Sequence, residues 1–313
     1  MEKVWLKNYD PGVPHTIDYP DKTLHELLED SARDFPDYTA TIFPGVVGDS
    51  GRVSYGQMDE QCNRLANALV DMGVNKGDRV ALLLPNCPQF VIGYFAALKA
   101  GAIVVATNPL YSPREMEFQL NDCGAETIIV LSVFYNTVMG IKDRTGLKNV
   151  IVTNIKEYLP RITRTLFSFL REEKEGHRVD ISGVEGAHEF QDLLSRYAPT
   201  PPSVDVSPDD VAMFQYTGGT TGTSKAAVAL HRNIVANVYQ MKAWSTPVEY
   251  KEQGEVVMGV MPLFHVYGMI TVMHLCVLGA AAMVLLPRFE TRQVLKAIGK
   301  YKPVFFPVCP QCT

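Results

Sequence analysis

Short apolar segments typical of buried strands alternate with helical segments in the first half of the chain, and this alternation constrains the fold most strongly. Strands are expected at residues 79–84, 102–106 and 127–131. A helical segment at 90–100 ends at Gly101, which closes the helix before the next strand. Strands that alternate with helices form parallel sheets, because each connecting helix packs on a face of the sheet. The sequence therefore predicts an α/β protein.

Two amphipathic helices are expected before this region. The first begins after the capping residue Thr23, and the second opens near residue 53. Their apolar side chains recur at helical spacing, namely Leu24, Leu27, Leu28 and Ala32 in the first helix and Met58, Cys62, Leu65, Ala66 and Leu69 in the second. Such stripes are typical of helices that pack one face against a core.

The strongest chemical signal lies at residues 216–233, which read YTGGTTGTSKAAVALHRN. An apolar strand at 211–214 precedes this segment, and a helix is expected over residues 226–241. Glycines let backbone N–H groups approach a ligand, while hydroxyl groups and a lysine add donors and positive charge. The pattern is typical of a phosphate-binding loop. The candidate ligand-binding residues are Thr217, Gly218, Gly219, Thr220, Thr221, Gly222, Thr223, Ser224 and Lys225.

Two other interpretations of this loop are weaker. The Walker loop ends in Gly-Lys-Ser/Thr, whereas here Lys225 follows Ser224 and precedes Ala226. A plain surface turn would not need three glycines, five hydroxyl groups and one lysine within nine positions. The segment instead resembles the phosphate loop of the adenylate-forming superfamily, and it differs from that loop at Ala226, where the family usually has glycine.

A second motif follows the loop. Residues 261–268 read MPLFHVYG, come after an expected strand at 256–260, and resemble the superfamily's Pro-Leu-Phe-His segment. A neutral imidazole at a strand end can bind a carboxylate or phosphate, although a lone histidine is often a core residue bonded to a carbonyl. Because His265 lies inside this motif, we interpret it as functional. The apolar residues at 269–278 could line a tunnel for an alkyl chain or form a core helix.

Three further segments resemble the amino-terminal half of bacterial long-chain fatty-acid–CoA ligases. They read LPNCPQF at 84–90, LKAGA at 98–102 and TNPLYSPRE at 107–115. Their prolines and glycines set turns, so we interpret them as fold markers and not as catalytic residues. The resemblance implies two sheet-and-helix subdomains of the adenylate-forming large domain.

The resemblance also implies a reaction in two steps. A fatty carboxylate attacks the α-phosphate of MgATP to give an acyl-adenylate and pyrophosphate, and the thiolate of coenzyme A then displaces AMP. The first step brings an anion to a polyanion, so neutralisation of charge is its main requirement. By family position, Lys225 and the loop hydroxyls would hold the phosphates, Thr220 would bind Mg²⁺, and His265 would lie beside the acyl-adenylate; Lys225 and His265 are the candidate catalytic residues.

Composition narrows the partners and the compartment. The net charge of −5 gives no basic field that would attract nucleic acid. The first ten residues lack the apolar stretch of a signal peptide, and the six scattered cysteines form no disulfide framework. A cytoplasmic protein is therefore expected, and the family resemblance adds a homodimer as the expected assembly of full-length members.

Two segments have features that could indicate contact with a membrane. Residues 256–287 contain no Asp, Glu, Lys or Arg and are long enough for a membrane span, but their histidines, proline and glycines favour strand, loop, buried helix and strand. Residues 159–170 are expected to form a helix with Ile162, Leu166 and Leu170 on one face and arginines around it. Such a helix is usually solvated, and peripheral contact with the inner membrane is the alternative.

A proline-dense connector at residues 198–208 is the clearest boundary in the chain. It predicts a first α/β subdomain at residues 1–200, with a charged amphipathic insert at about 159–178. The second subdomain, residues 201–313, carries the phosphate loop and is expected to be incomplete, because a length of 313 residues ends before the family's small carboxy-terminal domain.

The last six residues depart from the family. Residues 308–313 read VCPQCT where the family has Gly-Leu-Pro-Pro-Met-Tyr, and one added base before a coding sequence for these residues restores the family's reading. A single-base deletion is one hypothesis for this end, and the Cys309–Cys312 pair would then be an accident of frame. The segments that bind adenine and ribose, the magnesium glutamate and the small domain are expected to be missing, which predicts an inactive fragment.

Two alternative functions stay open at the level of sequence. One is another adenylate-forming acid–CoA ligase, for example one acting on aryl or medium-chain acids. The other is a non-catalytic module that binds a nucleotide or an acyl group. The leading prediction is ATP-dependent activation of a long-chain fatty acid to an acyl-CoA thioester.

Overall fold

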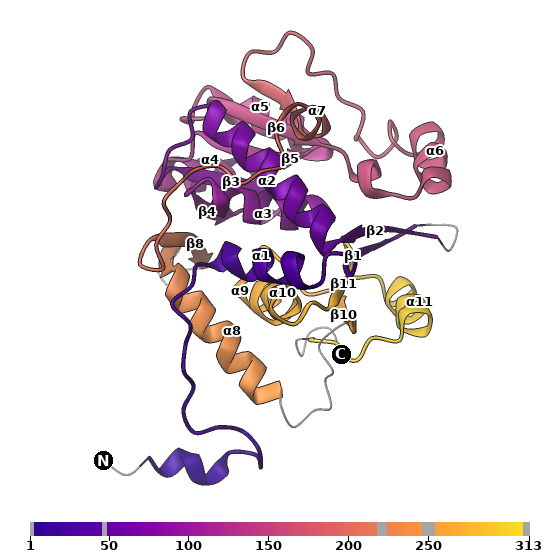
Figure 1. Ribbon diagram of the computed structural model, residues 1–313. Helices are drawn as coiled ribbons and strands as arrows, with labels where there is room; N and C mark the ends of the chain where they lie inside the picture. Colours follow the sequence, from indigo (N-terminus) through magenta and orange to yellow (C-terminus); the bar gives the residue numbers. More distant parts are fainter. Residues whose placement is uncertain (1–2, 46–48, 218–223, 246–253, 309–313) are drawn as a thin grey trace.

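Two sheets organise the computed structural model, which describes residues 3–45, 49–217, 224–245 and 254–308 (Figure 1). A seven-stranded sheet has the order β7-β6-β5-β3-β4-β8-β9, and a four-stranded sheet has the order β10-β11-β1-β2. The strands are β1 (Thr39–Pro44), β2 (Ser50–Ser54), β3 (Arg79–Leu83), β4 (Ile103–Ala106), β5 (Thr127–Leu131), β6 (Asn149–Thr153), β7 (Ala187–Glu189), β8 (Val211–Thr217), β9 (Lys225–Leu230), β10 (Val256–Gly259) and β11 (Ala282–Leu285). The predicted α/β class is confirmed.

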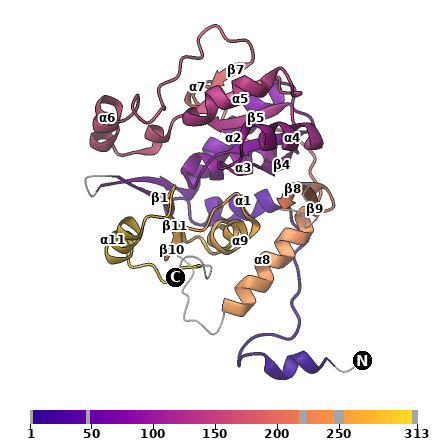
Figure 2. The same cartoon turned by 180° about the vertical axis from the view of Figure 1, so that it is seen from behind.

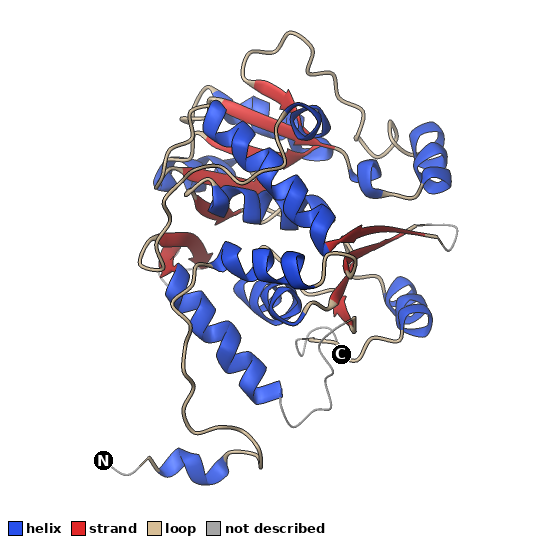
Figure 3. Cartoon of the chain, viewed as in Figure 1, coloured by secondary structure: helices blue, strands red, loops and turns tan. Residues whose placement is uncertain are grey.

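Helices cover the sheets and fill the space between them, as Figure 3 shows by colour. The α-helices are α1 (Leu24–Asp34), α2 (Tyr55–Asp71), α3 (Pro88–Lys99), α4 (Pro113–Cys123), α5 (Tyr135–Lys142), α6 (Arg161–Leu170), α7 (Phe190–Arg196), α8 (His231–Ser245), α9 (Val266–Gly268), α10 (Leu275–Gly279) and α11 (Thr291–Tyr301). Short 3-10 segments are η1 (Val4–Asn8), η2 (Ser132–Phe134) and η3 (Ile155–Tyr158), and η4 (Met269–His274) is a π-helix.

One large core joins the two sheets. It takes buried side chains from α1, α2 and α3, from η4 and α10, and from one face of each sheet. Helices α4 and α5 cover the opposite face of the seven-stranded sheet and form a second core, and α11 covers the opposite face of the four-stranded sheet. The apolar stripes predicted for the first two helices face the large core, with Leu24, Leu27 and Leu28 of α1 buried.

The expected βαβ pattern is confirmed in the middle of the seven-stranded sheet. Strand β3 pairs in parallel with β4 on one side and with β5 on the other, and β4 pairs in parallel with β8. The carboxyl ends of these strands therefore meet at one edge, which is where open α/β sheets bind ligands. Gly124 closes α4 in the left-handed conformation, as expected for a glycine after a helix.

The prediction of a helix over residues 226–241 is wrong in its first part. Residues 225–230 form β9, which pairs antiparallel with β8, and α8 begins only at His231. The side-chain oxygen of Asn233 accepts the backbone N–H of Leu230 at 3.0 Å where the helix starts. Small apolar residues occur in helices and in strands alike. Here the backbone pairing with β8 determines that the segment is a strand. The glycine-rich segment thus connects two antiparallel strands and does not lead into a helix.

Each sheet contains strands from both sides of residue 200. Strands β8 and β9 extend the sheet that begins with β3, while β1 pairs in parallel with β11 in the other sheet. The division into residues 1–200 and 201–313 therefore does not coincide with a division between sheets, and it stays a prediction.

The uncharged segment 256–287 folds as strand, helix and strand. It comprises β10, the continuous helical stretch from α9 through η4 to α10, and β11, as expected from its histidines and glycines. Within the described ranges, no helix is both long and apolar enough to cross a membrane. Met269, Val272 and Met273 of η4 are fully buried in the large core.

Candidate functional site

Three strand ends carry the residues that the sequence singled out. Strand β8 ends at Thr217, β4 is followed by Thr107, and β10 leads into the segment that holds His265. A side chain links two of these ends, because Nε2 of Gln215 lies 3.4 Å from the carbonyl oxygen of Phe264. The structure therefore brings the flank of the glycine-rich loop and the Pro-Leu-Phe-His segment together.

The described flanks of the loop form the base of a hairpin. Thr217 pairs with Lys225 across the two strands, and the hydroxyl of Ser224 donates to the carbonyl of Thr217 at 2.8 Å. Lys225 is exposed, and no carboxylate of the described part of the chain pairs with it. An exposed ammonium group without an acidic partner suits a bound polyanion. These flanks therefore fit a phosphate ligand.

The centre of the loop lies outside the described residues. The predictions that fall there concern Gly218, Gly219, Thr220, Thr221, Gly222 and Thr223, including the proposed role of Thr220 toward Mg²⁺. Those assignments stay predictions.

The Cys309–Cys312 pair also lies outside the described residues. The four other cysteines are free and buried, namely Cys62, Cys87, Cys123 and Cys276.

His265 caps the short helix α9 with its own ring. Its Nδ1 accepts the backbone N–H of Tyr267 at 3.2 Å, and its backbone N–H donates to the carbonyl of Pro262 at 3.1 Å. When Nδ1 of a neutral imidazole accepts, Nε2 carries the proton. The side chain is exposed, so Nε2–H is available to donate to a carboxylate or phosphate oxygen.

Asn86 fixes the segment before His265 and is a residue that the sequence reasoning assigned only to the fold. Its Nδ2 donates to the carbonyls of Gly259 and Met261, both at 2.9 Å, and its Oδ1 accepts the N–H of Leu263 at 2.8 Å. Asn86 is buried, so these bonds are shielded from water. The signal that could have revealed this role is an asparagine between two prolines, directly after a buried strand.

A glycine is needed at position 268 because the backbone carbonyls of Met261 and Pro262 lie close to its Cα. A Cβ at this position would lie 2.4 Å from the carbonyl oxygen of Pro262 and 2.8 Å from that of Met261. No real Cβ contact is that short, so a larger residue would push the turn that carries His265 out of place. The glycine of the MPLFHVYG motif thus has a steric function.

Two buried side-chain oxygens at these strand ends have no hydrogen-bond partner within the described residues. They are Oε1 of Gln215 and Oγ1 of Thr107. Buried polar atoms normally have partners, so both mark places where a ligand or water can bind.

Burial and a hydrogen bond to Asp122 raise the pKa of the hydroxyl of Tyr216, next to Gln215 in β8. The raised pKa keeps this tyrosine neutral.

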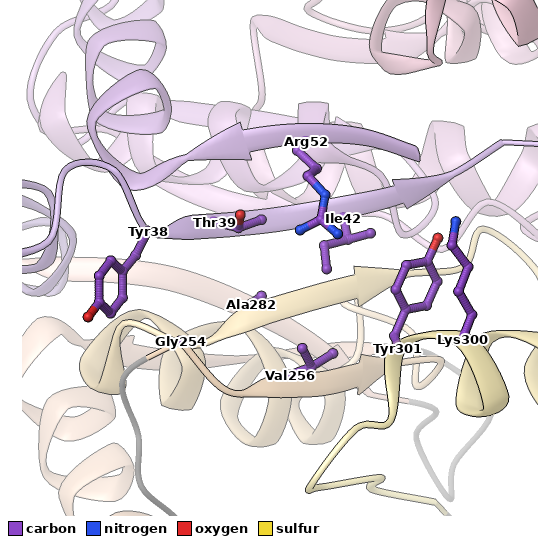
Figure 4. Close-up of a pocket in the computed structure, with 9 residues that line it drawn as sticks. All are labelled: Tyr38, Thr39, Ile42, Arg52, Gly254, Val256, Ala282, Lys300 and Tyr301. Atoms are coloured by element: carbon purple, nitrogen blue, oxygen red, sulfur yellow. The ribbon is translucent and has the colours of Figure 1, made fainter. Parts of the chain in front are cut away.

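A separate pocket of about 350 Å³ lies on the four-stranded sheet, away from these strand ends (Figure 4). Its charged lining consists of Arg52 from β2 and Lys300 from α11, with Tyr38 and Tyr301 at its two ends. The hydroxyls of Ser50 and Tyr301 are 2.5 Å apart beside it. Among the described residues, Thr217, Ser224, Lys225 and His265 do not line this pocket.

The two-sheet α/β fold, with antiparallel strands β8 and β9 on either side of the glycine-rich segment, matches the large domain of adenylate-forming enzymes. The chain belongs to the AMP-binding enzyme family, whose sequence profile matches residues 28–312.

Relatives within the family include ligases that form CoA thioesters. The chain is 38% identical to a long-chain-fatty-acid–CoA ligase of Bacillus subtilis over 99% of its own length and 54% of the relative's. It is 30% identical to 4-coumarate–CoA ligase 2 of Oryza sativa over 94% of its length and 49% of the relative's. The crystal structure of a long-chain-fatty-acid–CoA ligase from Archaeoglobus fulgidus superimposes with a TM-score of 0.78 at 26% identity, covering 97% of this chain and 55% of that one. The chain thus spans about half the length of the relatives it matches.

Proposed function

We propose that this chain provides the phosphate-binding and acyl-binding part of an AMP-forming long-chain fatty-acid–CoA ligase. The observation that supports this proposal best is that an exposed Lys225, which pairs with no carboxylate among the described residues, and the exposed ring of His265 lie at neighbouring strand ends. The similarity to the Bacillus subtilis ligase supports the long-chain substrate class.

Each described side chain has a simple part in this proposal. ATP with Mg²⁺, when bound, would supply the activated α-phosphate that a fatty carboxylate attacks. Lys225 neutralises phosphate charge, and the hydroxyl of Thr217 donates a hydrogen bond to a phosphate oxygen. His265 donates from Nε2 to an oxygen of the carboxylate or of the acyl phosphate, with its ring oriented by the bond from Tyr267.

The apolar helical stretch after His265 is the segment where we expect the acyl group of the substrate to bind. Residues 269–277 are apolar apart from Thr271 and His274, and η4 has the wider π-helical turn that is frequent at functional sites. We propose that the alkyl chain of the fatty acid packs along this stretch. Coenzyme A is then the thiol substrate of the second step.

Lys225→Ala is expected to weaken binding of MgATP by this chain about tenfold, because one charge-assisted hydrogen bond to a phosphate is lost. Lys225→Arg should retain most of the affinity. Titration calorimetry with the purified chain measures both values, and Lys296→Ala, which removes an exposed lysine of α11, serves as the control. Equal affinities of the parent and Lys225→Ala would refute the phosphate role of this lysine.

The similarity to the Oryza sativa enzyme favours a second candidate, an aryl-acid–CoA ligase. ATP–pyrophosphate exchange with a long-chain fatty acid and with an aryl acid separates the two candidates, since exchange follows only the acid that is activated. Binding of MgATP without exchange for either acid would favour a non-catalytic nucleotide-binding module.

A further inference from the structure

The pocket on the outer face of the four-stranded sheet has a positively charged lining. In both views of the ribbon, α11 packs on one side of this sheet, and α9 and α10 lie on the other side (Figures 1 and 2). The pocket lies on the side of α11, between Tyr38 and Tyr301, and we call it the α11 pocket. Of its described lining residues, Arg52 and Lys300 are basic and none is acidic. Such a lining attracts an anion.

Small residues create the space of the α11 pocket. Ala282 of β11 lies opposite Val256 of β10, and these two side chains form its floor together with Ile42 of β1. Gly254, directly before β10, lies beside the ring of Tyr38, because a Cβ on this glycine would be 3.7 Å from that ring. The floor is therefore an apolar patch of sheet on which a flat group can lie.

Lys300 is held at one end of the pocket. Its Nζ donates to the hydroxyl oxygen of Ser50 at 3.0 Å and lies 4.7 Å from the centre of the Tyr301 ring. The hydroxyl of Tyr301 is 2.5 Å from the same serine oxygen. These contacts join the end of α11 to the start of β2. The ammonium group therefore has a fixed position before a ligand binds.

Arg52 reaches the pocket from β2. It lies opposite Ile42 in the antiparallel pairing of β1 and β2, and Figure 4 shows its guanidinium group over Ile42. Its side chain is exposed, so it can turn toward a ligand without breaking a packed contact. A guanidinium group can form two parallel hydrogen bonds to a phosphate, which makes Arg52 the main candidate for binding an anion here.

Two glutamates near Arg52 are engaged with other groups. Arg52 also lines the neighbouring hollow, whose lining includes Glu60 and Glu157. Glu60 pairs with Arg64 at 2.7 Å, and Glu157 accepts the hydroxyl of Thr153 at 2.6 Å. Within the described parts of the chain, no carboxylate lies within ion-pair distance of the Arg52 guanidinium group. Its charge is therefore available to a ligand.

The opposite end of the pocket is aromatic. Tyr38 lies at this end in Figure 4, away from Lys300 and Tyr301. Its ring is tilted against that of Phe35, with 5.3 Å between the ring centres, and Tyr38 is 39% exposed. Part of the ring is thus open to the pocket, and planar heterocycles stack well on tyrosine.

We propose that the α11 pocket binds a nucleoside monophosphate. The phosphate lies between Arg52 and Lys300, and the base stacks on Tyr38 above the apolar floor. A volume of about 350 Å³ is in the range of pockets that hold small-molecule ligands. The site shares no residue with those assigned to ATP or acyl binding, so this inference does not depend on the proposed ligase function.

Two simpler ligands fit the pocket less well. Inorganic phosphate would occupy the basic end and leave the aromatic end empty. A long alkyl chain would find few apolar contacts, since the described floor offers it only the side chains of Ile42, Val256 and Ala282. A ligand with a phosphate at one end and a planar ring at the other uses both ends.

The test is titration calorimetry of the purified chain with AMP, ribose 5-phosphate, adenosine and inorganic phosphate. AMP should bind about tenfold more tightly than each of the other three, because it alone carries both the base and the phosphate. Arg52→Gln should raise the dissociation constant for AMP about tenfold, since a charge-assisted hydrogen bond is lost. Tyr38→Leu should raise it about fivefold through the loss of stacking.

Matched controls come from outside the pocket. Arg292 is exposed at the other end of α11 and Tyr19 is 47% exposed, so Arg292→Gln and Tyr19→Leu should leave the dissociation constant unchanged. Circular dichroism of each variant shows whether it folds like the parent.

Three results would overturn the proposal. The first is the absence of AMP binding by the parent, or equal affinities of the parent for AMP and ribose 5-phosphate. The second is an equal affinity of the parent and Arg52→Gln for AMP. The third is AMP binding that Lys225→Ala weakens and Arg52→Gln does not, since AMP would then bind at the glycine-rich segment.

Discussion

Two buried residues position the candidate site. Asn86 makes three hydrogen bonds to the backbone around residues 259–263, and Gly268 leaves room for the carbonyl of Pro262. Neither residue needs to touch a substrate to matter. Both fix the turn from which His265 projects, so they are positioning residues.

Asn86→Ala is expected to lower the free energy of unfolding by about 2–4 kcal/mol, because three buried backbone groups lose their partner. Urea unfolding of the chain measures this loss. Asn75→Ala is the matched control, since the Asn75 side chain makes its bonds at the exposed surface and should cost less than about 1 kcal/mol. The same loss in both variants would show that Asn86 does not hold the segment.

Helices α1, α2 and α3 and strands β3, β4 and β5 could be predicted from the sequence because their patterns are local. The segment 225–230 could not, since lysine, alanine, valine and leucine in this order suit both states until a partner strand is known. The pairing of strands that lie far apart in the sequence also has no local sequence pattern. The parallel pairing of β1 with β11 therefore could not be predicted from the sequence. For the candidate site, the motif predicted His265 and Lys225, but the roles of Asn86 and Gln215 depend on contacts that only the fold creates.

At the level of elements, a histidine joins two helices that lie far apart in the sequence. Nδ1 of His231, the first residue of α8, accepts the backbone N–H of Leu24, the first residue of α1, at 3.1 Å. The ring of His25 stands edge-on to it at 6.0 Å. Burial, together with nearby positive charge, lowers the pKa of both rings to about 4.

This lowered pKa predicts a loss of stability in mild acid. Between about pH 6.5 and pH 4 the unfolded chain binds protons at these histidines and the folded chain does not, so the free energy of unfolding falls as the pH falls. The stability that the two neutral histidines contribute is therefore fully present above about pH 6.5. Urea unfolding at several pH values should show a shallower dependence for His25→Gln/His231→Gln than for the parent. The exposed His15→Gln variant should keep the parent's slope, and an equally steep slope in the double variant would contradict the assignment.

At the level of the whole molecule, the two sheets bind the two halves of the chain together. Strand β8 lies beside β4, β11 lies beside β1, and one core takes side chains from both sides of residue 200. The proline-dense connector around that residue is mostly exposed. Cutting it therefore removes a covalent link and few contacts.

A protease site inserted between Thr200 and Pro201 should thus be cleaved without separation of the fragments. Size-exclusion chromatography in native buffer should show one complex, and the fragments should separate only in denaturant. The uncleaved insertion variant is the control. Elution as two independent folded pieces would instead support the division at residue 200 as a division between domains.

The pairing of β1 with β11 also has a consequence for protein synthesis. Ile42 of β1 lies opposite Val284 of β11, so during synthesis this edge of β1 stays unpaired until the later strand has also been made. The hairpin with β2 can close at once, whereas the parallel partner arrives last. During that interval the nascent chain carries an unpaired strand edge, which is a surface prone to aggregation.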